Sequence, residues 1–413
     1  TYYKDIAPLV EKRCQKCHQA ESVAPFPLET YEEVRDFAPA SLHAMESGKM
    51  PPWSPDPSCR NYSNERMILP DEIAVFKSWI DAGFPQGDPQ DTPETNDEAS
   101  PDTIFEPTHI GTMEEPYLPA TVLTDDYRCF PLDIDIEESS YIKGSRVVPD
   151  QLAMVHHVLV YAIPPEMSDV LDAIDKADSG PGYTCFGGSE VGVPIPIGAW
   201  VPGLNEFVFD EGMGIHLWAG SRIVMQVHYN TLTTDPVPDN TRWEVTLSPE
   251  PPTSLIESRP FAHRTIEIPA GEENSVQVKT FTNRTDEAWE VISVAPHMHL
   301  LGVKIRVDVV HEHGESCLID IPSWDFNWQQ NYDLKPNERV KVLPGETVRL
   351  TCVYDNSAPN QALVDGERLE PVDVRWGDGT LDEMCLTYLT MVRPYDSPPA
   401  LCTTFNECST SCQ

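Results

Sequence analysis

The sequence predicts a multidomain protein in which a small all-α domain is followed by two all-β antiparallel sandwiches of the jelly-roll-like kind. The chain has 413 residues, a length that suggests roughly two to four domains. Helical periodicity is concentrated in residues 1–88. Beyond them, short β-branched runs alternate with Pro, Gly, Asn and Asp, a pattern typical of sandwiches.

Residues 1–88 carry the helical signals. Apolar Ile6 and Leu9 lie at helical spacing within residues 3–17, and residues 71–82 read as an amphipathic helix. Residues 89–107 are acidic and Pro-rich, and we expect them to form a linker.

The remaining sequence divides into two predicted sandwiches. A Pro-rich break at residues 249–253 suggests a join between residues 108–252 and residues 253–395, and residues 396–413 form a Cys-rich tail. Runs expected to be strands are 155–162, 222–229, 265–268, 303–310 and 347–354. The 40 prolines fit long loops and edge strands better than helices.

Charge and hydropathy exclude several functions. The net charge is -39, from 67 acidic and 28 basic residues, so nucleic acid and anionic membranes are not expected partners. No apolar run reaches ~18 residues, so we expect no transmembrane segment. The chain opens without Met or a signal peptide, and we expect a mature secreted chain from which the signal was removed.

Cys14-Gln15-Lys16-Cys17-His18 is the attachment pattern of a c-type haem. Two thiols bind the haem covalently, and the adjacent His18 reaches the iron. Within a short helical segment this pattern predicts a small cytochrome c domain with haem c as its core, against the competing reading of a zinc or redox C-x-x-C site. For the second iron ligand we favour Met50, which precedes two prolines; the rivals are Met45, Met67 and His43.

Eleven cysteines are present, and haem attachment leaves nine. Because nine is odd, we expect mostly disulfides and one thiol that is unpaired or joined to another chain, which leaves a homo-oligomer or larger assembly open. Three cysteines, Cys402, Cys408 and Cys412, crowd the C-terminus. Disulfides and attached haem both indicate a periplasmic or extracellular location.

A second group of metal-binding side chains lies downstream. A lone histidine is usually a satisfied core residue, but five at strand positions together with a methionine point to metal ligands. Adjacent residues on a strand point to opposite faces, so the first histidine pair needs a local bulge to bind one metal. Imidazole with thioether favours copper over zinc. The residues are His156, His157, His228, His297, His299 and Met384.

Four stretches, in order, resemble the type II copper, ascorbate-dependent monooxygenases, the family of peptidylglycine alpha-hydroxylating and dopamine beta-monooxygenases. They are Val155-His156-His157-Val158-Leu159, Gln226-Val227-His228-Tyr229-Asn230, His297-Met298-His299-Leu300-Leu301-Gly302 and Asp382-Glu383-Met384-Cys385-Leu386-Thr387-Tyr388. The resemblance implies two coppers, one in each sandwich, facing each other across a wet cleft. The first three histidines would accept electrons, while His297, His299 and Met384 would bind O₂ and hydroxylate a C–H bond.

The resemblance also carries departures. Ala295 replaces an Arg that grips a substrate carboxylate, and Leu386 replaces an Asn, whereas Tyr388 keeps the place of a substrate-contacting Tyr. A neutral or apolar small molecule is therefore the expected substrate. The resemblance pairs Cys352 with Cys385; the usual partner of Cys129 is missing, and Cys185 is a substitute.

These features together predict a copper monooxygenase that receives electrons through its haem, from a redox protein or a small reductant, replacing or supplementing ascorbate. The alternative is an electron-transfer, copper-binding or assembly protein whose sandwich pair has no oxygenase activity. A multicopper oxidase is weaker, because no His-Cys-His cluster is present.

Overall fold

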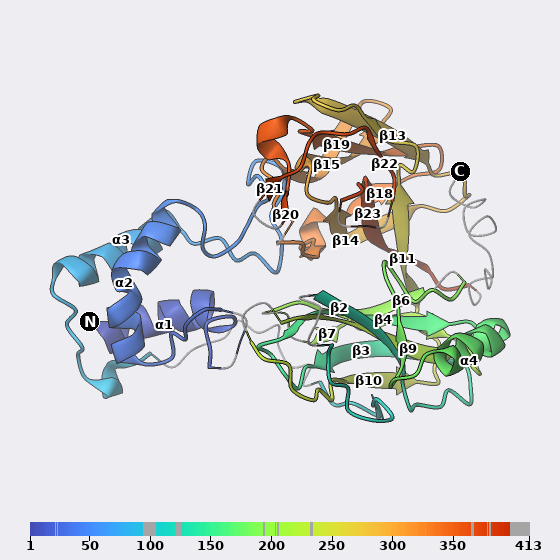
Figure 1. The fold of residues 1–413 in the computed structure, drawn as a ribbon, viewed down its shortest axis with the longest axis horizontal. Helices are drawn as coiled ribbons and strands as arrows, with labels where there is room; N and C mark the ends of the chain where they lie inside the picture. Colours follow the sequence, from blue (N-terminus) through green and yellow to red (C-terminus); the bar gives the residue numbers. More distant parts are fainter. Residues whose placement is uncertain are drawn as a thin grey trace.

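The computed structural model describes residues 1–20, 22, 24–93, 105–120, 125–192, 195–202, 204, 206–231, 234–326, 328–364, 367–377, 379 and 381–396. It has a helical lobe and two β-rich lobes, which we call the first and second sandwich (Figure 1). Most of the predicted Cys-rich tail and residues 94–104 of the predicted linker lie outside the described residues.

The helical lobe comes from the first part of the chain. It contains a helical run made of Tyr2–Ile6, α1 (Ala7–Val10) and Glu11–Gln15, then α2 (Tyr31–Glu46), α3 (Pro70–Asp81) and a short turn at Pro89–Asp91. Thr30 and Glu33 form a reciprocal capping box that starts α2. Ile6 and Trp79 lie in the apolar core of this lobe. The predicted helix over 71–82 is confirmed to within one residue.

The first sandwich is built on a five-stranded sheet within the described residues. Its order is β5 (Tyr183–Thr184), β2 (Asp125–Pro131), β9 (Arg222–Asn230), β4 (Val155–Ile163) and β6 (Ile195–Trp200). A turn at Pro165–Met167 and helix α4 (Ser168–Ala177) follow β4. The facing layer consists of β1 (His109–Gly111), β10 (Arg242–Ser248), β3 (Ser140–Val148), β7 (Phe207–Val208) and β8 (Met213–Leu217).

The second sandwich repeats this layering. One layer holds β11 (Ser254–Ala262), β23 (Leu386–Pro394), β14 (Trp289–His297), β17 (Tyr332–Asp333) and β18 (Val340–Val342). The other holds β13 (Ser275–Thr282), β19 (Thr347–Tyr354), β15 (Gly302–His311) and β16 (Gly314–Ile321). Smaller elements are β12 (Glu267–Ile268), β22 (Val374–Arg375), β20 (Leu363–Val364), β21 (Glu367–Arg368) and turns at Pro336–Glu338 and Ala358–Asn360.

The two sandwiches share one continuous sheet. Strands β8 and β11 pair in parallel, with Ser254 opposite Met213 and Leu255 opposite Gly214. The Pro-rich break at 249–253 therefore changes the direction of the chain without ending the sheet. Each sandwich nevertheless keeps its own apolar core, around Trp243 in the first and Tyr354 in the second.

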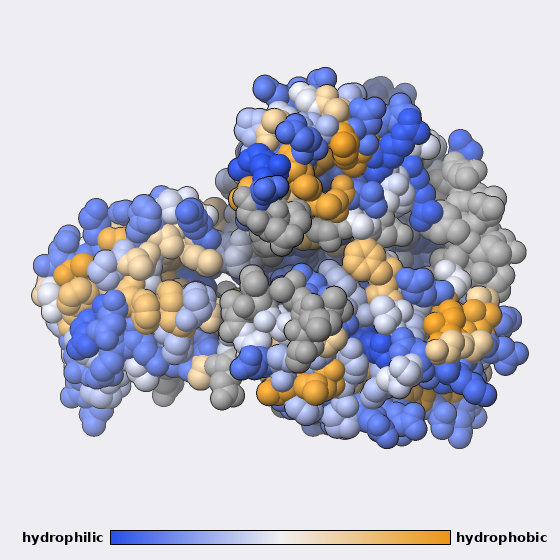
Figure 2. Space-filling model, in the orientation of Figure 1, coloured by the Kyte–Doolittle hydropathy of each residue, from blue (hydrophilic) through white to orange (hydrophobic). Residues whose placement is uncertain are grey.

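The chain surface agrees with the acidic composition. Hydrophilic residues cover much of the visible face, with apolar patches on each lobe (Figure 2). Among the described residues, no helix is both long and apolar enough to cross a membrane.

Candidate metal centres

Strands β4 and β9 bring the first three histidines together. His157 lies opposite His228, and the pairing register shifts between Val155 and His157. Such a shift is a β-bulge, which lets adjacent residues point to one face. The bulge supplies the local irregularity that His156 and His157 need in order to bind the same metal ion.

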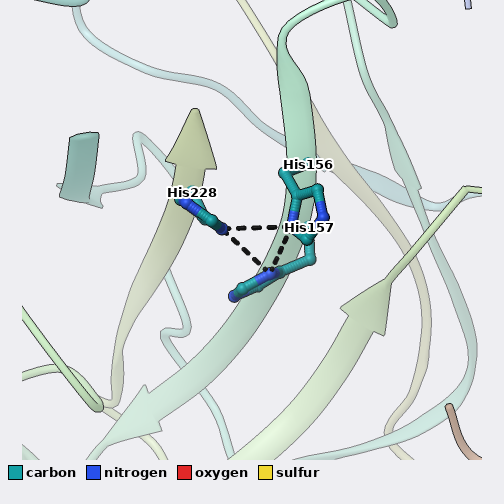
Figure 3. Close-up of side chains that lie close together, drawn as sticks. All are labelled: His156, His157 and His228. Atoms are coloured by element: carbon teal, nitrogen blue, oxygen red, sulfur yellow. Dashed lines mark hydrogen bonds between the residues drawn. The ribbon is translucent and has the colours of Figure 1, made fainter. Parts of the chain in front are cut away.

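The three imidazoles converge through their Nδ1 atoms (Figure 3). His156 Nδ1 lies 3.1 Å from His228 Nδ1, and each lies 3.3 Å from His157 Nδ1. A metal that binds nitrogens at ~2.0 Å in tetrahedral directions would hold them ~3.3 Å apart. Because a neutral ring nitrogen is either one donor or one acceptor, a cation satisfies three converging nitrogens better than hydrogen bonds do. These residues therefore fit a copper ion; we call them the three-histidine site.

Neighbouring groups prepare this site to bind a metal. Burial and, to a smaller extent, the neighbouring His228 lower the pKa of His156 to about 4, so the ring is neutral and keeps a lone pair at ordinary pH. His228 Nε2 lies 2.9 Å from Asp125 Oδ1, and Tyr127 stacks on the same ring at 4.1 Å between centroids. The hydrogen bond with His228 lowers the pKa of Asp125. A carboxylate behind an imidazole fixes which nitrogen faces the metal.

The second group lies at the end of β14 and the start of β23. His297 and His299 have ring centroids 5.1 Å apart and nearly perpendicular planes, at 87°. His297 Nδ1 contacts Gln329 Oε1, and His299 Nδ1 lies 3.0 Å from the carbonyl oxygen of Asp382. Both partners are oxygen acceptors, so each Nδ1 carries the proton and each Nε2 remains for a metal.

Met384 is held at the same end of this sheet. His297 pairs with Leu386 across β14 and β23, so Met384 lies just beyond the paired residues. Its side chain is buried, and Tyr354 donates its hydroxyl to the Met384 carbonyl at 2.7 Å. Two imidazoles, together with a thioether from a residue at the same end of the sheet, are a ligand set that suits copper, because soft thioethers select Cu(I). We call His297, His299 and Met384 the His-Met site.

Residues 262–412 match the family described as copper type II ascorbate-dependent monooxygenase, C-terminal domain. The match supports the resemblance carried by the two motifs within these residues, those around His297 and Met384, and the matched family is one of copper- and ascorbate-dependent monooxygenases. The His-Met site lies within the matched residues, and the three-histidine site precedes them.

Other comparisons add no functional information. No curated protein sequence matches the chain. The major capsid protein P2 of bacteriophage PM2 is 8% identical over 71% of this chain and 99% of its own, with a TM-score of 0.30. The T13 infectious bursal disease virus (IBDV) particle protein is 8% identical over 70% of this chain and 77% of its own, with a TM-score of 0.18. These likenesses are too weak to support an argument.

Glu383 organises the backbone around the His-Met site. Its carboxylate accepts from the backbone N–H of His299 at 2.8 Å, of Leu301 at 2.6 Å and of Met384 at 3.3 Å. The side chain is fully buried, which raises the pKa of Glu383 to about 7, while the backbone hydrogen bonds oppose this rise. The Glu383 carboxylate therefore connects the segment that carries His299 to the segment that carries Met384.

Disulfides support the strands that carry both sites. Cys352–Cys385 is formed next to Met384, and Cys129–Cys185 joins β2 to the segment after β5. The predicted Cys352–Cys385 pairing is confirmed, and Cys129 pairs with Cys185, which had been named only as a substitute for the missing family partner. The third disulfide of the described residues, Cys59–Cys317, was not predicted.

The first and second sandwich approach each other near these residues. Burial is the main cause that lowers the pKa of His157, the neighbouring His228 and His156 add to it, and His297 of the second sandwich contributes least. Tyr388, on β23 opposite Ala295, similarly contributes to the raised pKa of Tyr161 on β4. The predicted substrate-contacting residue Tyr388 thus lies where the second sandwich approaches the first.

The helical lobe presents residues that fit a covalently attached haem. Cys14 and Cys17 are unpaired thiols, and burial raises the pKa of Cys14 to about 12. His18 Nδ1 lies 3.0 Å from the Phe26 carbonyl oxygen, which leaves Nε2 for a metal. Phe26 stacks on Phe37 with centroids 3.9 Å apart, beside the His18 ring.

The second haem ligand stays a prediction. Met50 follows α2, and its backbone N–H donates to the Ala44 carbonyl at 3.1 Å. The rival Met45 is buried in the core of the helical lobe. The haem itself also remains a prediction, since the family match does not include this lobe.

Sequence reasoning missed the groups that hold the ligands. Asp125, Gln329 and the carbonyl of Asp382 were not singled out, although each contacts a ligand histidine. Glu383 lay inside a quoted motif without a role. The sequence offered one signal for such residues, which is a position next to a predicted ligand. Glu383 has this position beside Met384, whereas Gln329 lies next to no predicted ligand.

Proposed function

We propose that the protein is a copper-dependent monooxygenase that hydroxylates a C–H bond of a small neutral or apolar substrate with O₂. In this reaction one oxygen atom enters the C–H bond, the other leaves as water, and two electrons and two protons are consumed. The observation that carries the proposal is the presence of two imidazole groups, one in each sandwich, the second within residues that match the copper monooxygenase C-terminal domain.

The ligand sets favour different roles for the two sites. Bound copper would supply one-electron transfer at the three-histidine site and reaction with O₂ at the His-Met site. Asp125 fixes the orientation of His228 and adds negative charge behind it, which suits a site that passes electrons. At the other site, Gln329 and the Asp382 carbonyl orient two rings, and Met384 provides a soft ligand.

The substrate class follows from the side chains opposite the His-Met site. Ala295 and Tyr388 are paired across β14 and β23, and Leu386 pairs with His297. An alanine at this place offers no cation for a carboxylate. A small substrate without an acidic group therefore suits these residues.

Electrons would enter through the helical lobe. Cys14, Cys17 and His18 would hold a c-type haem, which supplies a one-electron carrier in the same chain. The external donor would be a redox protein or a small reductant such as ascorbate, in the periplasm or outside the cell. The disulfides of both sandwiches are consistent with a secreted protein.

Isotope labelling tests the oxygenase reaction. The copper-loaded protein is supplied with ascorbate, ¹⁸O₂ and small molecules that carry an activated C–H bond. We expect one ¹⁸O atom in each product molecule and no product with His299→Ala. His313→Ala, at an exposed side chain, is the matched control and should keep full activity. Two bound coppers without any O₂-dependent product would instead favour a copper-binding or assembly protein.

A double substitution tests the haem feed. Cys14→Ser with Cys17→Ser removes covalent attachment while leaving both sandwiches unchanged. We expect turnover driven by a protein donor to fall strongly, and turnover driven by ascorbate to fall less. Full turnover of this variant with the protein donor would show that electrons do not pass through the haem.

A further inference from the structure

Residues 51–66 leave the helical lobe and lie on the second sandwich before the chain returns to α3. Figure 1 shows this loop running from the helices to the upper lobe. The loop is joined to the second sandwich by a disulfide and by hydrogen bonds. The Cys59–Cys317 disulfide joins the loop to β16, and the Arg60 guanidinium donates to the Cys317 carbonyl at 2.8 Å. We call residues 51–66 the strap.

The strap is built into the core of the second sandwich. Tyr62 is 1% exposed, belongs to that core and donates its hydroxyl to the Leu318 carbonyl at 2.9 Å. Trp53 packs edge-on against Tyr332 at 5.3 Å between centroids. Tyr62 is buried and Trp53 is partly buried against the same core, so the strap is part of this fold rather than a loose tether.

The strap also grips the chain just before and within β17. Pro52 accepts a hydrogen bond from Gln330 Nε2 at 3.2 Å. Asn64 Nδ2 donates to the Asn331 carbonyl at 2.7 Å, and Asn64 Oδ1 accepts from the Asp333 N–H at 3.1 Å. Three of the four positions from Gln330 to Asp333 in the second sandwich are thus held by hydrogen bonds to residues of the strap.

Gln329 is the residue that precedes this gripped segment. Its Oε1 accepts from His297 Nδ1, and its Nε2 donates to the Phe326 carbonyl at 2.9 Å. These two bonds fix the amide orientation and, through it, the direction in which His297 Nε2 points. The neighbour Gln330 is held by Pro52 of the strap. A chain of direct contacts therefore runs from the strap to a ligand of the His-Met site.

We infer that Gln329 is a positioning residue for His297 and that the strap holds Gln329 in place, so that the N-terminal part of the chain completes the His-Met site. This inference rests on the proposed function, because it takes His297 as a copper ligand. The N-terminal part of the chain would then have two roles, electron transfer through the helical lobe and support of the His-Met site through the strap. Outer contacts of this kind typically change metal affinity 10–100-fold.

Copper titration and electron paramagnetic resonance of the resting Cu(II) protein test the inference without turnover. Gln329→Leu removes the acceptor, and we expect a ~10–100-fold loss of copper affinity at the His-Met site with an altered Cu(II) spectrum. Gln329→Glu keeps an acceptor oxygen and should restore the affinity. Gln330→Ala should shift the same spectrum in the same direction by less. The three-histidine site in the same molecules serves as an internal reference.

Gln277→Ala is the matched control, because Gln277 Nε2 also donates to a backbone carbonyl in this sandwich, that of Glu267, far along the chain from the ligands. It should leave both spectra unchanged. Thermal unfolding of every variant separates loss of fold from loss of positioning. A two-copper protein in which Gln329→Leu and Gln330→Ala leave the His-Met spectrum unchanged overturns this inference alone. An unsubstituted protein without copper at the His-Met site overturns the proposed function as well.

Discussion

The two candidate copper sites differ in what stands behind their imidazoles. In the three-histidine site the partner is a carboxylate, with Asp125 at 2.9 Å from His228. In the His-Met site the partners are uncharged oxygens, from Gln329 and from the Asp382 carbonyl. A negative partner raises ligand basicity and favours the more positive metal ion, whereas neutral partners and a thioether favour Cu(I). These partners suit the proposed roles, in which one site would exchange electrons and the other would react with O₂.

Removing either buried disulfide should have the largest effect and should separate the two sites. Cys129–Cys185 spans 56 residues and Cys352–Cys385 spans 33, so the loss of either would destabilise its sandwich by ~4 kcal/mol. Denaturant unfolding of the paired Cys→Ala variants measures this. Because Cys385 adjoins Met384, its loss should also weaken copper binding at the His-Met site only. Equal weakening at both sites in both variants would contradict the idea that each sandwich supports its own site.

Glu383→Gln should have the second largest effect and should lower the free energy of unfolding by ~2–3 kcal/mol. The amide keeps one acceptor oxygen but places an NH₂ donor against backbone N–H groups such as those of His299 and Leu301. Copper binding at the His-Met site should weaken while the three-histidine site keeps its affinity. Glu244→Gln is the matched control, since Glu244 is also a buried glutamate but lies in the first sandwich. A weakened three-histidine site in Glu383→Gln would argue against the separation.

Features that depend on neighbouring residues alone, such as the positions of strands, could be predicted from the sequence. Strand runs such as 155–162 and 347–354 stand out because β-branched residues sit between turn formers, and they match β4 and β19 closely. His297 is the last residue of β14 and His299 lies just beyond it, so the alternation of side chains along a strand does not by itself place both rings. The need for a bulge at His156 followed from strand geometry alone, and the register shift supplies it.

Long-range contacts were not predictable from a single sequence. Nothing in the strap composition indicates that Tyr62 enters the core of a domain more than 200 residues away. The parallel pairing of β8 with β11 has no sequence signature either, since strand order depends on tertiary packing. Asp125 and Gln329 belong to the same class, because each supports a ligand through a contact between distant segments.

Asp125→Asn should weaken copper binding at the three-histidine site ~10–100-fold and leave the His-Met site unchanged. The amide removes the negative charge behind His228, so the reduction potential of this copper should rise. Copper titration and a redox titration followed by electron paramagnetic resonance measure both effects. Asp126→Asn is the matched control, because Asp126 bonds to the Tyr117 hydroxyl instead of a ligand. A rise in potential at both sites would show that the two sites are not electrostatically distinct.

Tyr127→Leu should produce the smallest effect. The Tyr127 ring stacks on His228 with centroids 4.1 Å apart and planes 4° from parallel, a contact worth about 1 kcal/mol. Copper affinity at the three-histidine site should therefore fall by ~5-fold. Phe326→Leu is the counterpart at the other site, where the ring meets His299 edge-on at 6.0 Å, and its effect should be smaller still. A larger loss of copper affinity for Phe326→Leu would show that ring packing matters more at the His-Met site than at the three-histidine site. The difference between the two sites would then depend on ring packing as well as on hydrogen-bond partners.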